Sequence, residues 1–112
     1  MNLKIFRLGN FSKEAKKLYK KYKKLPSDLK ELSVRLNTNP KAGIELGLNC
    51  YKIRLENSSI PTGKSGGFRI VYYYYDGETD LYLLSIFSKR DMENISDERV
   101  LELLSRYGLD KK

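Results

Sequence analysis

The sequence predicts an α+β fold in which a mostly antiparallel sheet packs against an N-terminal helical hairpin and a C-terminal helix. Three patterns lead to this class: two amphipathic helical patterns near the start, a block of strand patterns after them, and a capped helical pattern at the end. The length of 112 residues suits a single domain, 1–112, with one core.

The N-terminal part predicts a short strand followed by two helices. Residues 3–8 are mainly apolar and indicate the strand. From Phe11, apolar residues recur every three or four positions among many lysines, so we expect a helix with one apolar and one cationic face. Pro26 ends this helix and opens a second one, whose leucine stripe stops before Pro40. Two helices joined so tightly form a hairpin.

The middle of the chain predicts the sheet. Residues 41–49 contain two glycines and are expected to be a connector. Residues 50–56 alternate between apolar and polar types, and residues 68–75 are rich in aromatic and β-branched types, so both are expected to be strands. The polar residues 57–67 form the loop between them. An Asp-Gly turn then leads into the apolar residues 81–87, which suit a central strand.

The last helix is expected to begin after Ser96 and to end at Gly108. Ser96 is a suitable N-cap, and the two acidic residues that follow it favour the positive end of a helix. Ile95 and Val100 occupy the two positions of a hydrophobic staple. Gly108 suits the turn that closes a helix.

Charge and residue types narrow the functions that the chain can have. It carries 22 Lys and Arg against 14 Asp and Glu, a net charge of +8, which favours an anionic partner such as nucleic acid. Basic domains of this size also occur for solubility alone. The absence of His and the single Cys exclude imidazole catalysis, internal disulfides and multi-cysteine zinc sites, so we expect no metal and no other cofactor.

The hydropathy of the chain favours a cytoplasmic protein with no membrane partner. No apolar run reaches the roughly 18 residues that a membrane helix needs. The first residues also lack a signal-peptide pattern, because Lys4 and Arg7 interrupt them.

Strand alternation gathers cations on one side of the predicted sheet. Lys52 and Arg54 face the side of their strand that Ile53 does not. In the next strand, Arg69 likewise faces the side that Ile70 does not. If the apolar sides pack on the helices, the three cations share an exposed side, with Arg69 between Lys52 and Arg54 across the hairpin. The cations that follow the last long strand are able to reach its edge, namely Lys89 and Arg90.

Such a surface suits a nucleic-acid backbone, because cations bind phosphates and tyrosine rings stack on bases. The candidate RNA-binding residues are lysines of the first helix, a loop lysine, a strand tyrosine and the lysine after the last strand: Lys16, Lys17, Lys20, Lys21, Lys64, Tyr73 and Lys89. Each has an ordinary alternative, since exposed lysines are common on helices and alternating tyrosines often belong half to a core.

Three segments in order carry a resemblance to a known family: residues 50–55 (CYKIRL), 67–72 (GFRIVY) and 83–90 (LLSIFSKR). With them, the chain resembles the RelE/HigB family of toxins from type II toxin–antitoxin systems. The long polar insert before the tyrosine run looks closest to the HigB-like branch. The resemblance implies a ribosome-dependent endoribonuclease that cuts mRNA in the ribosomal A site.

The resemblance also implies site residues and partners. Catalytic roles fall on Lys52, Arg54, Arg69 and Arg90, whereas the family's C-terminal catalytic Tyr falls at Ser96 and has no counterpart there. The implied partners are the ribosome, mRNA and a cognate antitoxin, expected to be a HigA-like helix-turn-helix protein. Two other functions stay open: a ParE-like toxin that binds DNA gyrase, and an RNA- or ribosome-binding module without catalysis.

Overall fold

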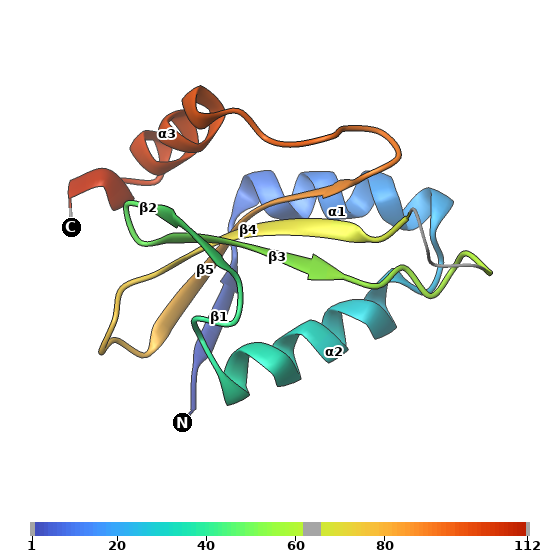
Figure 1. Ribbon diagram of the computed structural model, residues 1–112, viewed down its shortest axis with the longest axis horizontal. Helices are drawn as coiled ribbons and strands as arrows, with labels where there is room; N and C mark the ends of the chain where they lie inside the picture. Colours follow the sequence, from blue (N-terminus) through green and yellow to red (C-terminus); the bar gives the residue numbers. More distant parts are fainter. Residues whose placement is uncertain (1, 62–65, 112) are drawn as a thin grey trace.

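The computed structural model describes residues 2–61 and 66–111 (Figure 1). Its elements follow in the order β1 (Lys4–Arg7), α1 (Gly9–Lys21), α2 (Leu25–Thr38), β2 (Ile44–Gly47), β3 (Cys50–Leu55), β4 (Phe68–Tyr74), β5 (Asp80–Ser88), α3 (Asp97–Arg106) and a 3₁₀ helix, η1 (Leu109–Lys111). The predicted α+β class, the helical hairpin and the C-terminal helix are confirmed.

One five-stranded sheet forms the centre of the fold, with strand order β1-β5-β4-β3-β2. The pairs β2–β3, β3–β4 and β4–β5 are antiparallel, and β1 pairs with β5 in parallel. The parallel pair arises because the helical hairpin carries the chain from β1 at one edge to β2 at the other. The sheet is therefore mostly antiparallel, as predicted.

The strand β2 corrects the prediction of a connector over residues 41–49. It pairs with β3 through a tight turn at Leu48 and Asn49, whose φ angles are 55° and 64°. Hairpin turns of this kind need positive φ at both central residues, and glycine or asparagine usually supplies it. All four β2 residues are exposed, so the strand has no buried face that would produce an alternating sequence pattern.

Helices cover both faces of the sheet (Figure 1). One face packs on α1 and α2 in an apolar cluster that includes Phe11, Leu36, Ile53, Ile70 and Tyr72. The other face packs on α3 in a second cluster that includes Cys50, Val71, Tyr73, Leu84, Leu103 and Leu104. The predicted packing of one side of β3 and β4 on the helical hairpin is confirmed. The expectation that the opposite side is open is wrong for the part that α3 covers.

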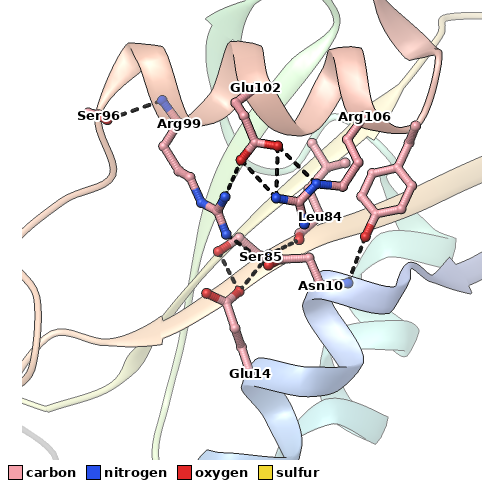
Figure 2. A network of polar contacts seen from close by, with 9 residues as sticks. Asn10, Glu14, Leu84, Ser85, Ser96, Arg99, Glu102 and Arg106 are labelled. Atoms are coloured by element: carbon pink, nitrogen blue, oxygen red, sulfur yellow. Dashed lines mark hydrogen bonds and ion pairs between the residues drawn. The ribbon is translucent and has the colours of Figure 1, made fainter.

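Two side chains of α1 cap the edge of β5 where β1 has ended (Figure 2). Asn10 Nδ2 donates to Leu84 O at 2.9 Å, and Glu14 Oε1 accepts from Ile86 N at 3.2 Å. Glu14 Oε1 also accepts from Ser85 Oγ at 2.7 Å. These side chains thus satisfy backbone groups that a longer β1 would have paired.

Asn10 also ties α3 to the rest of the fold. Its Oδ1 accepts from Arg99 Nη2 at 2.8 Å, and its backbone N–H donates to the Tyr107 hydroxyl at 2.7 Å. Asn10 is buried, so these bonds are partly shielded from water. The position of α3 therefore depends on polar contacts as well as on its apolar face.

Replacing Glu14 with alanine should lower the free energy of unfolding by about 1–3 kcal/mol. The reason is that the Ile86 N–H and the Ser85 hydroxyl lose their acceptor. Urea denaturation measures the change, and Lys13→Ala at the exposed neighbouring position is the control. Equal midpoints for the two variants would contradict the capping role.

The single cysteine is expected to be chemically silent in the folded protein. Burial raises the pKa of the Cys50 thiol to about 12, so near pH 8 the group is both covered and protonated. A thiol reagent such as DTNB should react with it only after unfolding. The pKa of an exposed thiol is about 8.5. Because unfolding lets Cys50 ionise, the free energy of unfolding should fall as the pH rises above that value. Rapid labelling of the native protein would contradict this expectation.

Candidate nucleic-acid interface

Two arginines face each other across the β3–β4 pair. Arg54 and Arg69 are register partners, and both lie on the sheet side away from α1 and α2. Arg54 is exposed and Arg69 is half-buried. The register partner of Lys52 is Val71, so the expectation that Arg69 lies between Lys52 and Arg54 is wrong.

Gly67 provides the space in which the two arginine side chains meet. A Cβ atom on this residue would lie 3.5 Å from Arg69 Nη1 and 3.7 Å from Arg54 Nε. Both side chains therefore lie against the same glycine, just before β4 begins. Sequence reasoning missed this role of Gly67, although a glycine directly before an arginine-bearing strand is a readable signal.

The segment after β5 reaches the same place. The Lys89 N–H donates to Gly67 O at 3.2 Å, and the Arg90 N–H donates to Ser88 Oγ at 3.3 Å. Both residues are exposed. The structure thus brings the backbone of the predicted Lys89–Arg90 pair to the end of the sheet that carries Arg54 and Arg69.

The cations at this end of the sheet form a cluster that no acidic side chain of the described residues pairs with. The ion pairs found among residues 2–61 and 66–111 involve Lys41, Arg99 and Arg106. None involves the cations of the cluster, which are Lys52, Arg54, Arg69, Lys89 and Arg90. Like charges directly opposite each other on a sheet are destabilising. A bound anion would relieve that repulsion, and guanidinium groups fit phosphate oxygens in a bidentate manner.

Lys52 lies two residues from Arg54 on the same side of β3, a rise of roughly 7 Å. It is half-buried, and its Nζ donates to Asn94 Oδ1 at 2.9 Å. Asn94 belongs to the segment between β5 and α3. A hollow of about 280 Å³ opens beside this contact, with walls that include Leu46, Leu48 and Leu101. Asn94 is not among the site residues predicted from the sequence, because it lies in a segment without a periodic pattern.

The α1 lysines form a separate surface. The helix α1 packs on the sheet face opposite to Arg54 and Arg69. Its exposed lysines are Lys16, Lys17, Lys20 and Lys21. A second hollow, between α1 and α2, is lined by Arg7, Lys16 and Tyr19 among others. The predicted RNA-binding residues are therefore divided between two sides of the molecule.

Two predicted site residues do not join either surface in the described structure. Tyr73 is 1% exposed and packs beneath α3, so the expectation that its ring stacks on a base is wrong. Burial also raises the pKa of its phenol, which makes Tyr73 a poor substitute for a catalytic tyrosine. Lys64 lies outside the described residues.

Ser96 has the structural role that its sequence context predicts. Its Oγ accepts from Arg99 N at 3.1 Å and caps α3. The Ser96 hydroxyl, at the position that the sequence resemblance assigns to a catalytic Tyr, therefore acts as the N-cap of α3.

The described residues contain no helix long and apolar enough to cross a membrane. Within the same ranges, no three His, Cys, Asp or Glu side chains come together as metal ligands.

A search against models of protein families found none that matches this chain. Among solved structures, the E. coli toxin RelE is similar, in a form with two arginines replaced by alanine and in the free state. The TM-score is 0.57 and the sequence identity is 25%. The match covers 83% of this chain and 90% of that one.

Proposed function

We propose, from the premise that this chain has a RelE-like toxin fold, that it is an endoribonuclease toxin that cuts mRNA in the ribosomal A site. The observation that carries the proposal is the Arg54–Arg69 pair over Gly67, which lacks a carboxylate partner among the described residues. Its position beside Lys52 supports a site for one phosphodiester group.

The proposed chemistry uses the mRNA 2′-hydroxyl as the nucleophile. Such a step needs a base for that hydroxyl, positive charge around the phosphorane and an acid for the leaving 5′-oxygen. Arg54 and Arg69 suit the phosphate contacts, because a guanidinium keeps its proton and presents several N–H donors. Lys52, as an ammonium group, is the candidate acid for the leaving 5′-oxygen, and the ribosome or the mRNA is the candidate source of the base. Arg90 is a candidate for a further phosphate contact.

The proposed partners follow from charge and fold. The net charge of +8 supports binding to the ribosome and mRNA, and also to an acidic segment of an antitoxin. We place the chain in the HigB-like branch with a HigA-like helix-turn-helix antitoxin. An adjacent gene whose product abolishes toxicity on co-expression would support this assignment.

A second candidate function is ribosome or RNA binding without cleavage. The observation that favours it is the use of Ser96 as a helix cap together with the burial of Tyr73. Nothing in the arginine pair suggests a role in the third possibility, gyrase binding.

Cleavage of mRNA by purified protein on programmed ribosomes tests the proposal. Cuts mapped by their 5′ ends to codons in the A site would support the nuclease. Ribosome binding without cuts would favour the second candidate. Inhibition of DNA gyrase with no effect on ribosomes would replace both with a ParE-like function.

The α1 lysines should supply affinity for ribosomal RNA rather than chemistry. Replacing Lys16, Lys17, Lys20 and Lys21 with Gln should weaken ribosome binding and flatten its salt dependence, because each lost phosphate contact lowers the slope by about 0.7–0.9. Sedimentation with ribosomes across a salt series measures this.

The control for this variant removes the same number of charges from other exposed lysines: Lys4, Lys30, Lys41 and Lys111. An equal loss of binding in both variants would mean that α1 has no special role and that net charge alone sets the affinity.

A further inference from the structure

We propose that Asn94 is a positioning residue, which holds the Lys52 ammonium group at the cleavage site. This inference rests on the proposed function and adds a residue to it. Asn94 lies in the segment that connects β5 to α3, more than forty residues after Lys52 in the chain.

The contact itself is direct. Lys52 Nζ donates to Asn94 Oδ1 at 2.9 Å, and this is the one hydrogen bond that Nζ makes within residues 2–61 and 66–111. Asp97 lines the same hollow but forms no ion pair with Lys52 there. The amide oxygen is therefore what sets the direction of the lysine side chain.

The acceptor is itself held in place. Asn94 Oδ1 also accepts from the Ile95 N–H at 2.9 Å, which fixes the orientation of the amide. Ile95 packs against the second apolar cluster, which contains Val100 and Leu103 of α3. The Lys52 head group is thus connected to the core through a short chain of contacts. Free lysine side chains have many rotamers, so such a tether lowers the entropy lost when Lys52 engages a substrate.

An amide suits this role better than a carboxylate. It accepts a hydrogen bond from the ammonium group without cancelling its charge. The positive charge then remains available to a phosphate bound by Arg54 and Arg69, which lie on the same side of the sheet as Lys52. This arrangement holds the Lys52 ammonium group on the same sheet side as the two arginines, and no carboxylate within residues 2–61 and 66–111 pairs with any of the three.

A double-mutant cycle on programmed ribosomes tests the inference. Asn94→Ala, Lys52→Ala and the double variant are compared with the wild type by single-turnover cleavage and by ribosome affinity. Asn94→Ala should slow cleavage about tenfold with ribosome affinity unchanged, as expected for the coupling of two residues in contact. In the Lys52→Ala background, the same substitution should have no further effect.

Two further variants separate positioning from general damage. Asn94→Asp keeps an oxygen at the same place and should recover part of the rate, with the remainder lost because its charge pairs with Lys52. Glu93→Ala, at the exposed neighbouring position, should cleave at the wild-type rate. Circular dichroism checks the fold of each variant.

The possible failures are distinguishable. A wild type that binds ribosomes but does not cut mRNA overturns both the proposed function and this inference. A wild type that cuts, with Asn94→Ala equally fast, overturns the positioning role alone. The positioning role is also overturned if Asn94→Ala slows cleavage by the same factor in the wild type and in the Lys52→Ala variant.

Discussion

Arg69→Ala should reduce mRNA cleavage on programmed ribosomes by about a hundredfold to a thousandfold, the loss typical for one charged contact to a transition state. Arg69 lies opposite Arg54 and against Gly67, where a phosphate would relieve the repulsion between the two guanidiniums. Arg69→Lys should recover only part of the rate, because an ammonium group lacks the planar fork of donors.

Arg7→Ala is the matched control for this prediction. Arg7 is a strand arginine too, but it is exposed and lies in β1 at one edge of the sheet, two strands away from β4. The Arg7→Ala variant should cleave mRNA at the wild-type rate. Arg7→Ala and Arg69→Ala should both unfold at nearly the same urea concentration as the wild type. Full cleavage by Arg69→Ala and by Lys52→Ala would remove the nuclease site from this sheet face and favour RNA binding or gyrase binding instead.

Gly67→Ala should also impair cleavage strongly, by about a hundredfold, since small misplacements of catalytic groups have effects of this size. Gly67 has a φ of +89°, and an added Cβ would lie 3.1 Å from Leu55 O. The tight contact with Leu55 O would shift the backbone at this point of the β3–β4 pair, and the same Cβ would lie in van der Waals contact with Arg69 Nη1 and Arg54 Nε, so the shift would reach both guanidiniums.

Gly77→Ala separates the loss of space from backbone strain. Gly77 has a nearly identical φ of +88°, but a Cβ there would meet no atom within 4 Å. Both variants should lose about 1–2 kcal/mol of stability from the left-handed backbone, whereas only Gly67→Ala should lose cleavage. Equal activities for the two variants, measured well below their unfolding temperatures, would contradict the role of Gly67.

Local patterns in the sequence sufficed to predict the helices, the strands other than β2, and the side of β3 and β4 that packs on the helical hairpin. The leucine stripe of α2, the N-cap at Ser96 and the alternation in β3 depend on residues close together in the chain. Side-chain direction alternates along any strand, so the sequence placed Lys52, Arg54 and Arg69 on the side away from the helical hairpin. The order of the elements then sufficed for the fold class.

The neighbours of each residue depend on the tertiary structure. Alternation predicts the side of the sheet that a residue faces, but not its partner on the next strand. Only the pairing of β3 with β4 therefore places Arg54 opposite Arg69 and Lys52 opposite Val71. Burial of Tyr73 depends on where α3 returns to the sheet, and the fully exposed β2 carries no pattern to read. Gly67 and Asn94 belong to irregular segments, which lack a periodic pattern. Their contacts with Arg54, Arg69 and Lys52 join residues distant in the chain, and such contacts exist only once the sheet and α3 have assembled.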